Sequence, residues 1–61
     1  KKPIAAKLRW AVFKRDQYRC VLCASEEDLA ADHILSEARG GEATLENLQT
    51  LCRRCNAKKG A

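Results

Sequence analysis

The chain has 61 residues, enough for one small domain, and half of its hydrophobic residues are alanine (10) or cysteine (4). A domain of this size buries only about 60% of its unfolded surface, so the remaining apolar residues predict a thin core that needs a further source of stability. The net charge is +4, from 12 Lys and Arg against 8 Asp and Glu, with basic residues gathered near both ends. This distribution favours a polyanionic partner such as nucleic acid, although a plain solvated surface is the alternative. No apolar run approaches the roughly 20 residues needed to cross a bilayer, so we expect no membrane segment. The four cysteines have the spacing of metal ligands, and we therefore expect an intracellular location.

The first sixteen residues predict an amphipathic helix. Ile4, Leu8 and Val12 recur at the i, i+4, i+8 spacing of one helix face, and Pro3 suits the first turn. Residues 18–23 are expected to leave this helix and form a tight knuckle. We therefore divide a single domain, residues 1–61, into an N-terminal helix (1–16) and a compact core (17–60).

The rest of the chain predicts two short strands and a second helix. Residues 29–35 fit one strand, residues 36–43 a loop, and residues 48–51 an alternating second strand. Thr44 is a candidate cap for the turn before the second strand. A helix is expected from Arg53 until Gly60 stops it. The candidate core consists of Ile4, Leu8, Val12, Phe13, Val21, Leu22, Leu29, Ile34, Leu35, Leu45, Leu48 and Leu51, with Trp10 and Tyr18 at its margins. The order of elements predicts a small α+β domain.

The four cysteines form two pairs of metal-ligand spacing. Cys20 and Cys23 are separated by two residues, as are Cys52 and Cys55, which lets both thiolates of a pair reach one ion. Four thiolates in a closed tetrahedron are typical of structural Zn²⁺, which can contribute roughly 10–16 kcal/mol to folding. Two disulfides or a redox motif are the alternatives, but disulfides suit secreted chains and a redox motif is not expected twice in so short a chain. We predict a zinc-stapled domain.

Three polar residues between and beside the cysteines could support chemistry. His33 is the only histidine, and its imidazole can exchange a proton near neutral pH, whereas a structural or surface role is its ordinary alternative. Asp32 offers a hard oxygen ligand for Mg²⁺ or Mn²⁺, or else a salt bridge. Asn56 offers a neutral oxygen ligand, or else a helix cap.

Taken together, the segments Asp32-His33, Gly40-Gly41, Asn47-Leu48 and Cys52-Arg-Arg-Cys55-Asn56, followed by Lys59, closely resemble the HNH endonuclease family. The resemblance runs from about residue 15 to residue 60. It implies a ββα-metal motif after the N-terminal helix and a one-metal DNA endonuclease or nickase. In this reading Asp32 and Asn56 hold a catalytic Mg²⁺, Mn²⁺ or other divalent ion.

The resemblance also assigns the remaining roles. His33 is the general base that activates water, and the metal polarises the phosphoryl oxygen and stabilises the leaving 3′-oxygen. Asn47 hydrogen-bonds the loop so that His33 is correctly aimed. Ser36 and Asn56 stand where many members of the family carry Pro and His. Neighbouring strand residues point to opposite faces, so we expect the strand to end, bend or bulge at Asp32-His33.

Basic residues near this motif are candidates for DNA phosphate contacts. The main candidates are Arg39, Arg53, Arg54 and Lys59, and weaker ones are Arg15 and Arg19. Such contacts position the backbone and read no sequence, so little specificity is expected from the domain alone. Target choice is then expected to depend on a fused or associated domain, and cutting of both strands on a second copy. The alternatives are a non-catalytic zinc-organised DNA-binding module and a zinc-ribbon-like protein-interaction domain.

Overall fold

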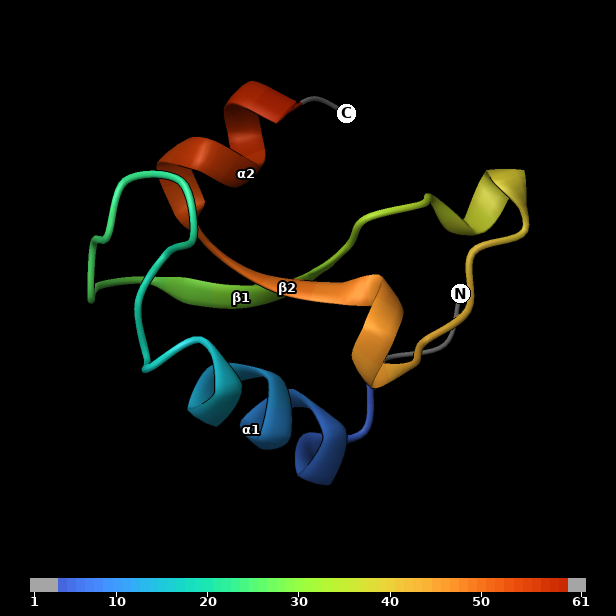
Figure 1. Cartoon of the computed structure of the whole chain (residues 1–61). Helices are drawn as coiled ribbons and strands as arrows, with labels where there is room; N and C mark the ends of the chain where they lie inside the picture. Colours follow the sequence, from blue (N-terminus) through green and yellow to red (C-terminus); the bar gives the residue numbers. More distant parts are fainter. Residues whose placement is uncertain (1–3, 60–61) are drawn as a thin grey trace.

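The computed structural model describes residues 4–59 and places a two-stranded sheet between two helices (Figure 1). The elements, in chain order, are α1 (Ala6–Arg15), β1 (Leu29–His33), the 3-10 turns η1 (Glu37–Arg39) and η2 (Leu45–Asn47), β2 (Leu48–Cys52) and α2 (Arg53–Lys59). Both helices contact both strands, and they lie on opposite sides of the hairpin. The expected small α+β architecture is confirmed, with the helix, hairpin and helix in the predicted order.

The N-terminal helix is shorter than its sequence pattern predicts. Ile4 and Ala5 are not helical, so α1 begins at Ala6, and the predicted start at Pro3 lies outside the described residues. The basic residues Lys14 and Arg15 occupy its last turn, where they interact favourably with the helix dipole. The helix ends because residues 17 and 18 adopt left-handed backbone conformations, with φ of 60° and 56°.

The two strands form a regular antiparallel ladder without a bulge. Leu29 lies opposite Cys52 at one end, and His33 lies opposite Leu48 at the other. Side chains alternate between the two faces of the hairpin. The side chain of His33 therefore lies on the same face as that of Thr50, and the side chain of Asp32 lies on the opposite face. The Thr50 hydroxyl hydrogen-bonds Val12 of α1, whereas the Asp32 carboxylate contacts Lys59 of α2. The two helices therefore cover opposite faces of the hairpin.

Arg15 and Asp16 fasten the end of α1 to the hairpin. The Arg15 guanidinium donates hydrogen bonds to the carbonyls of Leu45 and Leu48, at 2.6 and 2.7 Å, and pairs with Asp16. The Asp16 carboxylate accepts a hydrogen bond of 3.0 Å from the backbone N–H of Thr50. This N–H belongs to the outer edge of β2, so Asp16 satisfies a donor that the sheet itself leaves unpaired.

The core is smaller than the apolar sequence pattern predicts. The buried hydrophobic residues are Val12, Phe13, Cys20, Leu48, Leu51 and Cys52, and Thr50 is buried with them. The prediction was wrong for Val21, Leu22, Ile34, Leu35 and Leu45, which are exposed. Val21 and Leu22 lie between Cys20 and Cys23, whose sulfur atoms turn toward the four-cysteine cluster. Trp10 and Tyr18 are about half exposed, which agrees with their predicted place at the margin.

Two loop boundaries also differ in detail from the sequence pattern. β1 ends at His33 and not at residue 35, and the predicted loop contains the short turn η1. The predicted Thr44 cap is present, because its hydroxyl accepts a hydrogen bond from the backbone N–H of Asn47 at 3.2 Å. The predicted stop of α2 at Gly60 lies outside the described residues.

Candidate functional site

The four cysteines converge from two separate parts of the chain. Cys20 and Cys23 lie in the knuckle after α1, Cys52 ends β2 and Cys55 lies in the first turn of α2. All four sulfur atoms lie within 4.8 Å of one another. Thiolates about 2.3 Å from one zinc ion stand about 3.8 Å apart, and this cluster matches that size. Among residues 4–59 it is the one group of three or more Cys, His, Asp or Glu so arranged.

Hydrogen bonds within the cluster divide its thiols into two kinds. Burial would raise the pKa of the Cys20 thiol, but backbone hydrogen bonds from Cys52, Cys23 and Leu22, together with the Cys55 thiol, lower this pKa to about 6. The backbone hydrogen bond of Cys55 lowers the pKa of Cys52. The pKa of Cys55 is raised to about 12, because this thiol donates to Cys20 and Cys52. These hydrogen bonds favour the thiolate form, which is the form that binds metal, at Cys20 and Cys52.

Asp32 and His33 are the last two residues of β1, as the sequence pattern required. The strand ends at this pair with its register unbroken, so the two side chains start from opposite faces of the hairpin. The Asp32 carboxylate accepts hydrogen bonds from Lys59 Nζ at 2.5 Å and from Gln49 Nε2 at 3.3 Å. The sequence pattern does not indicate this contact of Gln49, whose only signal is its place opposite Asp32 in the ladder.

The imidazole of His33 contains a buried polar atom with no partner. Its Nε2 is shielded from solvent and makes no hydrogen bond within residues 4–59. Buried polar atoms are nearly always hydrogen-bonded, so an unpaired one suggests a site for an exchangeable ligand. The carbonyl oxygen of His33 is occupied, because it accepts a hydrogen bond from Lys59.

Asn56 is related to Asp32 only indirectly, through Lys59 of α2. Asn56 is partly buried and lies one helical turn before Lys59, so both residues project from adjacent positions on the helix surface. Lys59 reaches Asp32 from there. Among residues 4–59, no hydrogen bond joins Asp32 to Asn56 or to the His33 imidazole. The oxygen atoms of Asp32 and Asn56 are of the kind that suits a hard divalent ion.

Asn47 fixes the loop that follows His33. Its side-chain oxygen accepts from the backbone N–H of Leu35 at 2.8 Å, and its amide nitrogen donates to the carbonyls of Leu35 and Glu42 at 3.1 and 2.9 Å. Its own carbonyl accepts from the N–H of Ile34 at 2.8 Å. Gly41 permits this packing, since a Cβ there would lie 1.8 Å from the Leu35 oxygen. These contacts hold Ile34 and Leu35, the two residues that follow His33, in place.

A family model described as HNH endonuclease matches residues 20–61. The chain belongs to the HNH endonuclease family. The match begins at the first cysteine and includes both strands, the loop and α2, which confirms the resemblance seen in the sequence. No curated protein and no solved structure matches the chain significantly. The N-terminal helix α1 lies outside the match, although the Arg15 and Asp16 contacts join it to the HNH core.

The basic residues predicted to contact phosphate fall into two groups in this HNH domain. Arg39, Arg53 and Arg54 are exposed and form no ion pair within residues 4–59. Lys59 is instead paired with Asp32. Of the weaker candidates, Arg15 is engaged with the hairpin and Arg19 lies 3.7 Å from Glu26. Within the described residues, neither helix is long and apolar enough to cross a membrane.

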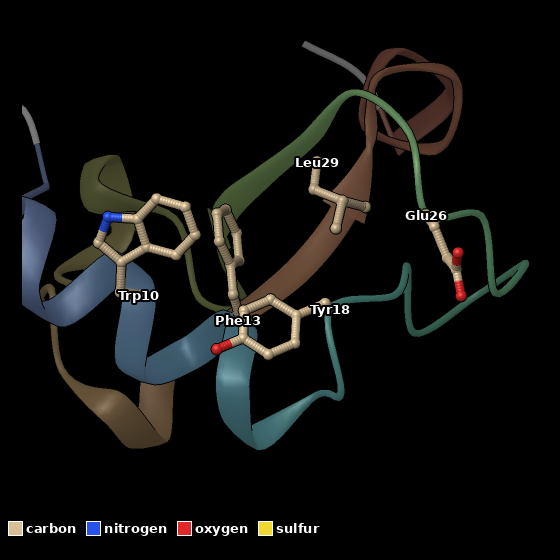
Figure 2. Close-up of a pocket in the computed structure, with 5 residues that line it drawn as sticks. All are labelled: Trp10, Phe13, Tyr18, Glu26 and Leu29. Carbon is tan, nitrogen blue, oxygen red and sulfur yellow. The ribbon is translucent and has the colours of Figure 1, made fainter.

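A separate hollow of about 450 Å³ lies beside α1 (Figure 2). It is lined by Trp10, Phe13, Tyr18, Glu26 and Leu29. The rings of Trp10 and Phe13 pack edge to face, with centroids 5.5 Å apart. Leu29 begins β1, whereas Asp32 and His33 end it, so this hollow lies at the other end of the strand and is not the candidate HNH site.

Proposed function

We propose that this HNH domain is a metal-dependent DNA endonuclease that hydrolyses phosphodiester bonds. The proposal rests mainly on the arrangement of residues at the end of strand β1. Asp32 and His33 close β1, α2 reaches Asp32, and the imidazole Nε2 of His33 is buried and unpaired. This buried, unpaired nitrogen, on the residue that follows Asp32, favours catalysis over a non-catalytic DNA-binding module.

Two kinds of metal ion would serve this domain. Zn²⁺ bound by the four cysteine thiolates would join the knuckle, β2 and α2, and so hold the hairpin against the last helix. Asp32 and Asn56 would hold a second ion, Mg²⁺ or Mn²⁺, through oxygen atoms and leave most of its coordination positions to water and phosphate. When bound, this ion would polarise the phosphoryl group and stabilise the departing oxygen.

His33 is the proposed general base. Its Nε2 would accept a proton from the water that attacks phosphorus. The bond between phosphorus and the 3′-oxygen would break, and that oxygen would take up a proton from solvent water. The products would be a 5′-phosphate and a 3′-hydroxyl. Asn47 would keep His33 in position by holding residues 34 and 35, which follow it directly.

DNA binding is assigned to exposed guanidinium groups at the two ends of the hairpin. Arg39 lies in η1 of the loop, and Arg53 and Arg54 begin α2. None of the three is used in an ion pair within residues 4–59, so their charge is available to phosphates. One site in a 61-residue chain favours cutting one strand at a time, unless two copies act together.

Cleavage of supercoiled plasmid in Mg²⁺ or Mn²⁺ tests the proposal. Loss of a general base lowers rates by about 10²–10⁴-fold, so we expect nicked product from the native chain and at least 100-fold less from His33→Ala. His33→Asn, which keeps a polar side chain that cannot accept a proton near neutral pH, is expected to be equally inactive. Zinc content and circular dichroism should be unchanged in both variants. Equal cleavage by His33→Ala would refute the assignment, and DNA binding without cleavage by the native chain would favour a binding module.

A further inference from the structure

The ammonium group of Lys59 lies where it restricts access to the proposed metal ligand. Lys59 Nζ is 2.5 Å from Asp32 Oδ2 and 2.5 Å from the His33 carbonyl oxygen. Gln49 donates to the same carboxylate oxygen at 3.3 Å. The Asp32 side chain is only 15% exposed and that of Lys59 is 37% exposed, so water screens this pair less than an open surface pair.

We propose that Lys59 is a tethered counter-ion of Asp32 that a divalent metal ion displaces when it binds. The inference rests on the proposed function of Asp32 as a metal ligand. Asp32 carries one negative charge, which Lys59 already neutralises. A divalent ion on the same carboxylate would meet a neighbouring ammonium group, and like charges at this range repel one another. The lysine must therefore move for the metal to be bound tightly.

The position of Lys59 makes such a movement feasible. Lys59 is the last residue of α2, and its ammonium is carried on a flexible four-carbon stem. Its release breaks two hydrogen bonds but leaves the strand pairing and the cysteine cluster in place. The released ammonium would remain beside the site and could pair with a DNA phosphate, so the same residue would serve Asp32 before metal binding and the substrate afterwards.

Lys58 provides a matched control for the charge of Lys59. It is the preceding residue of α2, is exposed and forms no ion pair within residues 4–59. Adjacent helix residues point in different directions, so Lys58→Met removes the same unit of charge without removing the contact to Asp32. If the loss of one positive charge alone raised the affinity for the metal, Lys58→Met and Lys59→Met would show the same increase. If the metal ion displaces the ammonium group from Asp32, only Lys59→Met shows it.

The first experiment measures Mn²⁺ affinity of the zinc-loaded protein by titration calorimetry, without DNA. A pair of this kind is worth up to about a factor of five in an equilibrium, so we expect Lys59→Met to bind Mn²⁺ roughly fivefold more tightly than Lys58→Met. Combined with Asp32→Asn, the Lys59→Met substitution is expected to have no effect on Mn²⁺ affinity. Equal or weaker binding by Lys59→Met, with binding still dependent on Asp32, would overturn this inference alone. If Mn²⁺ binding does not depend on Asp32 in any variant, the proposed metal site fails as well.

The second experiment follows the lysine itself. Acylation of the native zinc-loaded protein, read by mass spectrometry, reports how accessible each amine is. We expect Mg²⁺ to speed the labelling of Lys59 by at least twofold and to leave Lys58 unchanged. Labelling of Lys59 that is independent of Mg²⁺ would show that the ammonium stays on Asp32, and the inference would be wrong.

Discussion

Asn47 and Leu35 are joined by a reciprocal pair of hydrogen bonds across a turn of the loop. The Asn47 side-chain oxygen accepts from the Leu35 N–H, and its amide nitrogen donates to the Leu35 carbonyl. A side-chain amide has both a donor and an acceptor, as a backbone peptide does, so Asn47 imitates one further rung of the hairpin. The ladder ends at His33, and this contact extends its order two residues further into the loop.

The first prediction compares two substitutions of Asn47. Asn47→Ala removes three side-chain hydrogen bonds and is expected to lower the free energy of unfolding by about 2 kcal/mol. Asn47→Asp keeps the shape but places carboxylate oxygen against the carbonyls of Leu35 and Glu42, so it should be at least as destabilising. Both variants should retain zinc and lose most of their cleavage activity. Chemical denaturation gives the stabilities, and a native-like Asn47→Asp variant would contradict the role given to the donor nitrogen.

The second prediction concerns the two adjacent glycines. A Cβ at Gly41 would overlap the Leu35 oxygen at 1.8 Å and approach the Asn47 amide at 2.8 Å, so Gly41→Ala must displace the loop. Losing the two bonds between Asn47 and Leu35 is expected to cost about 2 kcal/mol or more. Gly40→Ala is the control: its Cβ would meet nothing within 4 Å, but its φ of 90° costs an alanine about 1 kcal/mol. Equal denaturation midpoints for the two variants would contradict the predicted overlap.

The third prediction is that zinc and folding are inseparable in this domain. Two of the six buried hydrophobic residues are cysteines of the cluster, so the apolar core alone is too small to hold the chain together. Removal of Zn²⁺ with a chelator should abolish the helical signal in circular dichroism, and added Zn²⁺ should restore it. Mg²⁺ should not, because thiolates favour softer ions. A chelated protein that keeps its helices would show that the core suffices.

The sequence predicted the parts of the fold that depend on local rules. Cysteine spacing indicated the cluster, alternation indicated the second strand, and the position of Thr44 indicated a cap that the structure confirms. These features depend on a few neighbouring residues each. The roles proposed for Asp32, His33 and Asn56 came from the family resemblance and stay predictions.

The features that sequence did not predict are those set by contacts between distant segments. No local pattern indicates that Arg15 and Asp16 bind the hairpin more than 30 residues away, or that Gln49 and Lys59 share the Asp32 carboxylate. The core was overestimated for a related reason. Periodicity marks Ile34 as a strand residue, but β1 ends one residue earlier and a two-stranded sheet has little surface to cover it.

The last prediction is a pH dependence that separates Asp16 from the cysteines. Hydrogen bonds from the Arg15 guanidinium lower the pKa of Asp16, and those from Thr50 add to this, against the opposing effect of burial. A carboxyl group with a lowered folded pKa contributes stability that is fully present above its ordinary value, near 3.8, and is lost as the pH falls through the folded value. Asp16→Asn should therefore be less stable than the native chain by a constant amount, about 1–2 kcal/mol, between pH 8 and pH 5.

Urea denaturation with excess zinc across this pH range checks the difference. Groups other than Asp16, the metal-binding thiolates among them, would account for any acid unfolding above pH 5, so the native chain and Asp16→Asn should lose stability in parallel there. The two curves should converge only below about pH 4, where Asp16 itself takes up a proton. Equal stability of the native chain and Asp16→Asn between pH 8 and pH 5 would mean that the contacts of the Asp16 carboxylate with Arg15 and Thr50 contribute little to holding α1 against the hairpin.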